Sequence, residues 1–159
     1  MPEAIVTPDQ DAVVTQIEIA APPARVFEAI TDPKQQAVWW GSEPTTDLRV
    51  FEMEARLGGR WRFHGVGRDG LAVNGVSDFH AHGEIIEYDP PRVLAYTWIA
   101  NWHDQPDART VVRWEVVPAG TGSLVKVTHS GLRQLAVARK DYTGGWPGVL
   151  QLLNNYLKA

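Results

Sequence analysis

The sequence predicts an α+β domain in which a curved antiparallel sheet wraps around a long C-terminal helix. Alternating apolar and polar runs follow one another between residues 45 and 129, joined by short turns, which indicates an antiparallel meander. Residues 146–157 instead repeat apolar side chains at helical spacing. The length of 159 residues fits one domain, which we place at residues 13–159 after a flexible polar lead at residues 1–12.

One strand and two short helices are expected first. Residues 13–20 alternate apolar and polar side chains, which is typical of a strand. A helix is expected over residues 23–31, because Pro23 suits a first helical turn and the residue before Pro33 disfavours helix. The second helix is expected to run to about Trp40 and to end at the following glycine.

Five or six strands follow, and a helix closes the domain. Gly58 and Gly59 predict a hairpin turn, and residues 66–77 predict a glycine-rich loop. Residues 132–142 leave loop and helix both open, and the final helix is expected to have Pro147 near its first turn. The expected strands cover residues 45–57, 60–65, 79–88, 93–100, 110–117 and 124–129.

Composition excludes several classes of protein. The chain has no cysteine, which excludes disulfides, thiolate catalysis and cysteine-based zinc sites. The net charge is −4 and no Lys or Arg run exceeds two residues, so we expect no nucleic-acid partner. No apolar stretch approaches the roughly 20 residues of a membrane span, and the N-terminus does not resemble a signal peptide. We therefore expect no membrane span and a cytoplasmic location.

Tryptophan is unusually frequent, with seven residues against four Phe and four Tyr. Its side chain is a large apolar ring system with one N–H donor. The tryptophans therefore either fill a core or line a cavity for a ring-shaped or lipid-like ligand. We favour a mostly apolar cavity between the sheet and the final helix, because a twisted sheet that curls around one helix can leave a gap.

Alternation along the strands assigns the side chains that face the final helix. Trp39 and Trp40 are neighbours at a helix end and cannot both face the core, so one is expected inside and the other at the cavity entrance or on the surface. An exposed tryptophan there would favour a homodimer. For each candidate, plain core packing competes with ligand binding. The residues expected to contact a ligand are Trp39, Trp40, Trp61, Phe63, Tyr96, Trp98, Trp114, His129, Trp146, Leu150 and Leu153.

The histidines suggest two kinds of chemistry. An inward His129 could act as a general base or hold the polar end of a ligand, and the competing interpretation is a buried histidine bonded to backbone. His80 and His82 share a strand face, and Glu87 follows at a spacing similar to the metal motif of the cupin family. The later histidine of that motif is absent, so we expect neither a metal nor another cofactor.

Four segments, in order, resemble the family of Hsp90 ATPase activator homologues within the START-like or Bet v 1-like superfamily. They are VFEAITDPKQQAVWWG, GEIIEYDPPRVLAYTW, AGTGSLVKVTHSGL and GWPGVLQLLNNYL. The resemblance implies the helix-grip fold. It leaves the activity open, because relatives include ligand carriers, cyclases and aromatases, hydrolase-like stress proteins and co-chaperone domains.

Three functions follow from these observations as hypotheses. The first is binding of a small hydrophobic or aromatic molecule. The second is a cyclase-, aromatase- or hydrolase-like enzyme in which His129, Tyr96 or an arginine transfers a proton. The third is a chaperone-regulating interaction domain, suggested only by the resemblance. We favour the first, because no convincing catalytic constellation is present.

Overall fold

The computed structural model describes residues 2–158 as strands, helices and the turns between them. The strands are β1 (Ala4–Val6), β2 (Val13–Ile19), β3 (Thr46–Met53), β4 (Arg60–Gly67), β5 (Asp78–Asp89), β6 (Val93–Ala100), β7 (Thr110–Ala119) and β8 (Gly122–Ser130). The helices are α1 (Pro23–Thr31), α2 (Pro33–Trp39) and α3 (Ala136–Lys158), with single 3-10 turns η1 (Trp40–Ser42) and η2 (Arg68–Gly70).

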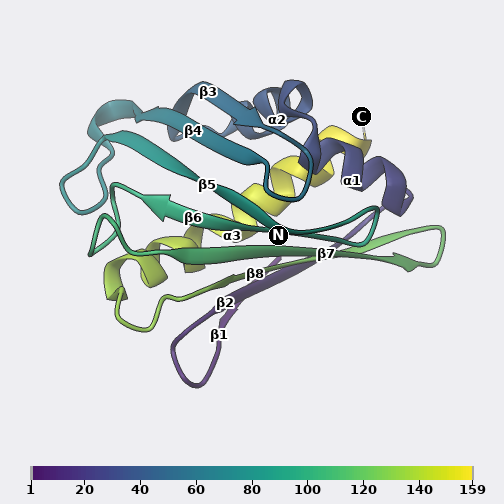
Figure 1. The fold of residues 1–159 in the computed structure, drawn as a ribbon. Helices are drawn as coiled ribbons and strands as arrows, with labels where there is room; N and C mark the ends of the chain where they lie inside the picture. Colours follow the sequence, from purple (N-terminus) through teal and green to yellow (C-terminus); the bar gives the residue numbers. More distant parts are fainter. Residues whose placement is uncertain (1, 159) are drawn as a thin grey trace.

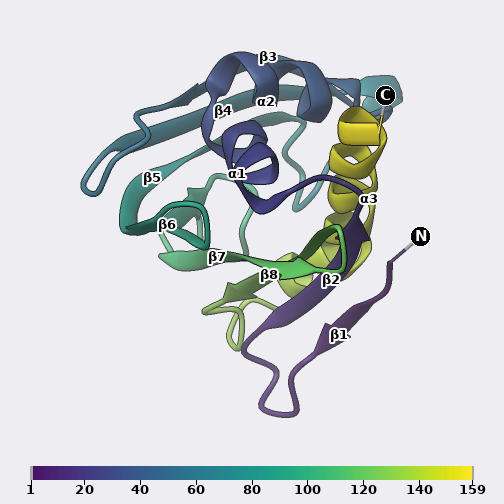
Figure 2. The same ribbon diagram turned by 90° about the vertical axis from the view of Figure 1, so that its right-hand side faces the viewer.

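All eight strands form one antiparallel sheet in the order β1-β2-β8-β7-β6-β5-β4-β3. The sheet curves around α3, whose length runs along the inner face, while α1 and α2 lie together near one end (Figures 1 and 2). The predicted α+β helix-grip architecture is confirmed. Within residues 2–158, no helix combines the length and the hydrophobicity that crossing a membrane requires.

Local sequence signals placed several elements correctly. Helix α1 spans Pro23–Thr31 as predicted, with a proline in its first turn and Val26, Phe27 and Ile30 buried on one face. Asp32 separates it from α2 and caps that helix, because its side chain accepts a hydrogen bond from the Lys34 backbone N–H. Strand β6 also has the predicted bounds.

The N-terminal segment differs from the flexible lead that was expected. Ala4–Val6 forms β1, which pairs with β2 at the edge of the sheet. The turn between the two strands is held by Asp9, whose side chain accepts from the Thr7 hydroxyl at 2.7 Å and lies 3.2 Å from the Arg133 guanidinium. Arg133 is distant in sequence, so local patterns could not reveal this anchor.

Helix α3 also begins earlier than predicted. It starts at Ala136, so Pro147 lies in its interior rather than in its first turn. The start is fixed by Asp104, whose carboxylate accepts from the backbone N–H groups of Val137 at 3.0 Å and Ala138 at 2.9 Å. Because this cap comes from the loop between β6 and β7, the sequence around residue 136 did not reveal it.

A bend in β5 brings the sheet close to itself at Gly83. A Cβ atom there would lie 1.8 Å from the backbone oxygen of Thr97, so only glycine fits. The same oxygen accepts the indole N–H of Trp61 at 2.8 Å. The register of β5 against β6 shifts just beyond the bend, between Ile85 and Glu87. The bend therefore fixes how Trp61 is held on the inner face.

Candidate functional site

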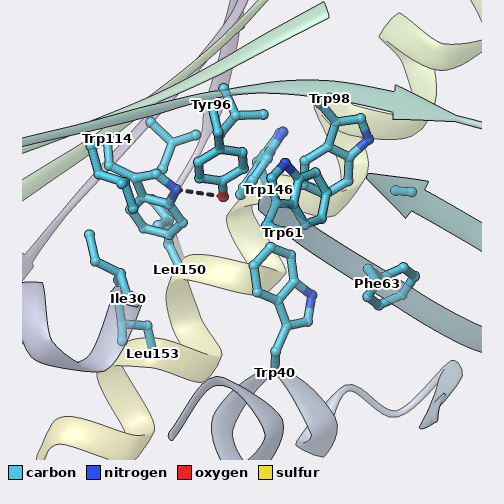
Figure 3. Close-up of a cluster of buried hydrophobic side chains, with 14 of the residues drawn as sticks. Ile30, Trp40, Trp61, Phe63, Tyr96, Trp98, Trp114, Trp146, Leu150 and Leu153 are labelled. Atoms are coloured by element: carbon cyan, nitrogen blue, oxygen red, sulfur yellow. Dashed lines mark hydrogen bonds between the residues drawn. The ribbon is translucent and has the colours of Figure 1, made fainter. Parts of the chain in front are cut away.

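Aromatic side chains from the sheet, from α3 and from the α2–η1 junction meet between the sheet and α3 (Figure 3). Trp98 on β6 is central: its ring centroid lies 4.7 Å from that of Trp61, 6.3 Å from Trp40 and 6.0 Å from Trp146. The ring centroid of Tyr96 lies 5.1 Å from that of Trp61. We name this group the aromatic cluster; its members are Trp39, Trp40, Phe51, Trp61, Phe63, Tyr96, Trp98, Trp114 and Trp146.

All eleven residues expected to contact a ligand lie in this interior. None of them exposes more than 9% of its surface, and His129, Leu150 and Leu153 expose none. The structure therefore agrees with the inward faces that alternation assigned. That these residues bind a ligand stays a prediction.

The expectation that Trp39 and Trp40 cannot both face the core was wrong, because both are buried, at 1% and 8% exposure. Neither lies on the surface, and Trp40 lines a small hollow. Helix α2 ends at Trp39 and continues as the tighter turn η1, and the two rings stack at 5.2 Å. The Trp39 indole donates to the Ala29 backbone oxygen at 2.9 Å, while Trp40 reaches Phe51 and Trp98. The argument for a homodimer through an exposed tryptophan therefore loses its premise.

Tyr96 places a hydroxyl group inside the cluster. The indole N–H of Trp114 donates to the Tyr96 oxygen at 3.0 Å (Figure 3). Within residues 2–158 the hydroxyl hydrogen has no protein acceptor. Burial raises the pKa of Tyr96 far above its ordinary value, so the phenol stays neutral. The arrangement leaves one buried O–H donor free for a further partner.

His129 uses both of its ring nitrogens. The Trp146 indole N–H donates to Nδ1 at 3.1 Å, so the ring proton is on Nε2, 2.8 Å from the Thr110 hydroxyl. That hydroxyl donates in turn to the Trp98 backbone oxygen at 2.7 Å. Burial lowers the pKa of His129 well below its ordinary value. The histidine is therefore neutral and linked through Thr110 to the backbone, and it has no free nitrogen to act as a general base.

A second buried histidine was missed by the sequence interpretation. His103 lies in the loop between β6 and β7, yet only 2% of its surface is exposed. Its Nε2 shares a hydrogen bond of 2.7 Å with the Tyr142 hydroxyl, and burial lowers its pKa to about 4. Its Nδ1 and the indole N–H of Trp98 are buried and find no hydrogen-bond partner among residues 2–158. The neighbouring Trp102 was the available signal, because an aromatic residue in a polar loop often folds inward.

Two hollows adjoin the aromatic cluster near β3, which is an edge strand of the sheet. The larger has a volume of about 550 Å³ and the smaller about 60 Å³. Phe51 lines the larger hollow, and its ring lies 5.3 Å from Trp40 and 6.5 Å from Phe63, which line the smaller one. The larger hollow is lined by Pro33, Phe51, Glu52, Met53, Glu54, Arg60, Trp61, Arg62, His82 and Gly83.

The structure does not bring together His80, His82 and Glu87, whose spacing is similar to the cupin metal motif. The register shift in β5 precedes Glu87, which instead pairs with Arg113 at 3.0 Å. His82 lines the larger hollow. His80 lies beside His64 and Asp78, which the sequence interpretation did not single out because their proximity depends on strand pairing.

Comparisons with known proteins agree with this architecture. The sequence profile of the family described as activator of Hsp90 ATPase homolog 1-like proteins matches residues 20–158. Protein Ms6760 from Mycobacterium smegmatis is 19% identical, with a TM-score of 0.75 over 98% of this chain and 93% of that one. Protein CV1439 from Chromobacterium violaceum is 19% identical, with a TM-score of 0.78 over 94% and 99%. Protein MLL2253 from Mesorhizobium loti is 24% identical, with a TM-score of 0.69 over 92% and 96%. No curated protein gave a significant match.

Proposed function

The chain belongs to the family of activator of Hsp90 ATPase homolog 1-like proteins, and from this premise we propose that it binds a small, ring-containing apolar molecule between the sheet and α3. Domains of this fold commonly bind ligands. The observation that carries the proposal is the hollow of about 550 Å³ that reaches Trp61, a member of the aromatic cluster. Ligand sites typically have volumes of about 300–1,000 Å³.

The hollow has an apolar part and a charged part. Phe51, Met53 and Trp61 are buried and belong to the inner face of the sheet. Glu52 and Arg62 form an ion pair on the exposed face beside them. Apolar walls with a small number of polar groups are typical of small-molecule sites. An apolar molecule would therefore enter beside β3 and move inward along Phe51 and Trp61.

The aromatic cluster defines the chemistry of the ligand. Indole rings offer flat apolar faces, on which a planar ring system packs in offset or edge-to-face contact. The free hydroxyl hydrogen of Tyr96 provides one donor in an otherwise apolar interior. A ligand with two or three rings and one acceptor oxygen, such as a carbonyl or phenolic oxygen, matches both features.

Binding is better supported than proton transfer. Both nitrogens of His129 are engaged, and its lowered pKa keeps it neutral. Burial raises the pKa of Tyr96, so that its proton is held more tightly than in water. A general base or acid works best with a pKa near the working pH. Of these two side chains, Tyr96 is therefore suited to orienting a ligand through its hydroxyl hydrogen, whereas His129 is bonded within the protein.

The test is to screen the purified full chain against two- and three-ring compounds, with and without an acceptor oxygen. Native mass spectrometry would detect a molecule already bound, and tryptophan fluorescence and melting temperature would report added ones. We expect oxygenated ring compounds to raise the melting temperature and to change the fluorescence. If no molecule is carried through purification and no compound produces either change, the proposal is wrong.

The Tyr96→Phe variant distinguishes specific binding from nonspecific hydrophobic association. The variant should weaken binding of oxygenated ligands by about 2- to 12-fold, the equivalent of one hydrogen bond of about 0.5–1.5 kcal/mol, and leave hydrocarbon analogues unaffected. Tyr88→Phe is the matched control, because Tyr88 packs against Phe27 instead of Trp114. Equal weakening by both variants would contradict the assigned role of Tyr96.

A further inference from the structure

We propose that His64, Asp78 and His80 form a binding site for a divalent transition metal ion of the zinc type on the outer face of the sheet. The ligating atoms of the three side chains all lie within 4.8 Å of one another. The site is separate from the proposed ligand site, because His64, Asp78 and His80 are not among the residues that line the larger hollow. The inner-facing neighbours Phe63, Phe79 and Ala81 are buried on the opposite side of the same strands.

Strand pairing places the three side chains together. His64 on β4 is directly opposite His80 on β5 in the antiparallel register, and Asp78 precedes His80 by two residues, so all three share one face. The two imidazole rings are nearly parallel, at 10°, with centroids 4.1 Å apart. Two adjacent strands therefore fix the positions from which the donors approach, and no loop rearrangement is needed to assemble them.

The donor atoms converge on one point. Nε2 of His64 lies 2.7 Å from Oδ1 of Asp78, and Nε2 of His80 lies 3.1 Å from Oδ2 of the same carboxylate. Because a carboxylate only accepts, both Nε2 atoms carry hydrogens in this arrangement. A metal ion at about 2.0–2.2 Å from each donor would take the place of those hydrogens. A neutral imidazole moves its single proton from Nε2 to Nδ1, whereas a protonated imidazole keeps its Nδ1 proton and releases the Nε2 proton to solvent.

Two imidazole nitrogens and one carboxylate oxygen match the preferences of zinc-type ions. Three protein ligands leave a fourth tetrahedral position for water. Among residues 2–158, the ion-pair partners of Asp78 are His64 and His80, while Arg62 is paired with Glu52, and Arg68 with Asp47. The side chains of His80 and Asp78 are 48% and 66% exposed, which gives an ion direct access and lets the rings adjust.

The position gives the site a structural consequence. His64 lies on β4 before the segment that connects it to β5, and Asp78 begins β5 after that segment. An ion held between them would link the two ends of the connection, whose Asn74 donates to the Trp102 backbone oxygen at 2.8 Å. Since an unfolded chain lacks this geometry, binding should stabilise the folded protein.

The experiment uses the full chain without a polyhistidine tag. Isothermal titration with Zn²⁺ and visible absorption with Co²⁺ would measure binding, and melting temperature would report stabilisation. We expect one Zn²⁺ per chain, a rise in melting temperature that EDTA reverses, and a Co²⁺ spectrum with nitrogen and oxygen ligands. Loss of a group that only hydrogen-bonds to a metal ligand typically lowers metal affinity by about 10–100-fold. His64→Ala and His80→Ala remove direct ligands and should weaken binding by at least about tenfold.

His82→Ala is the matched control. His82 is exposed and lies on the same face of β5 as His80, but it does not belong to the group of His64, Asp78 and His80. The sequence pattern alone instead groups His82 with His80. The control should bind Zn²⁺ like the unchanged chain, and all variants should melt alike in EDTA, which separates lost ligation from lost folding. Absence of saturable Zn²⁺ binding, or equal loss in His82→Ala and His80→Ala, would overturn the proposal.

Discussion

The indole N–H of Trp146 on α3 donates to Nδ1 of His129 on β8, with 3.1 Å between the two nitrogens. Both side chains are buried, at 2% and 0% exposure. The bond therefore joins the helix to the sheet inside a region of low polarity, and it determines which nitrogen of His129 carries the proton.

Trp146→Phe should lower the free energy of unfolding, because Nδ1 of His129 would be buried without a donor. An unsatisfied buried polar group costs about 1–3 kcal/mol, apart from the packing lost with the smaller ring. Urea unfolding would measure the change. In a double-mutant cycle with His129→Leu, the two effects should be strongly non-additive. Additive effects would contradict the coupling.

Stability should fall as the pH drops from 6.5 to 4. Burial lowers the pKa of His103 to about 4 and that of His129 well below its ordinary value, so the unfolded chain takes up protons that the folded chain does not. Burial also raises the pKa of Asp141 to about 6, which offsets one histidine below pH 6. Below pH 6, the free energy of unfolding should therefore fall by about 1.4 kcal/mol for each pH unit. Urea unfolding at several pH values would measure this slope.

Asp141→Asn tests the sign of that offset. The amide keeps an oxygen acceptor but cannot titrate, so the variant should lose stability about twice as steeply between pH 6 and 5. Equal slopes in the Asp141 variant and the unchanged chain would show that this carboxyl does not titrate in the window.

Two substitutions of glycine by alanine should change the stability of the folded protein in opposite directions. Gly83→Ala would place a Cβ against the Thr97 backbone oxygen, and overpacking of this kind costs about 1–3 kcal/mol or more. Gly144 lies inside α3 with open space around it, so Gly144→Ala should stabilise the protein by about 0.5–1 kcal/mol. Thermal unfolding of both variants would measure this. Stabilisation by Gly83→Ala would contradict the close approach of β5 to β6.

Phe51→Ala should open the route from the larger hollow to the smaller one. The variant should bind an apolar fluorescent dye faster and more tightly, at a stability cost of up to about 3–5 kcal/mol. Phe79→Ala is a control of similar burial that packs against Trp102 and lines neither hollow. If both variants bind the dye alike, the effect reflects general loosening and not access beside β3.

The sequence by itself determined the elements whose signals are local. The apolar face of α1 and the alternation in β6 are written in consecutive residues, and both elements have the predicted bounds. Alternation also assigned Trp98 and Trp114 to the interior, because successive side chains of a strand point to opposite faces of the sheet. The order of these elements was sufficient for the curved sheet around α3.

Only the tertiary structure decided the features that join distant segments. Asp104 sets the start of α3, η1 turns Trp40 inward beside Trp39, and the register of β4 against β5 brings His64 to Asp78. In each case the partner lies elsewhere in the chain, or the outcome depends on a small change in backbone geometry. Sequence periodicity reports which face a side chain occupies, whereas hydrogen bonds and ligand sets depend on which segments the fold places opposite that face.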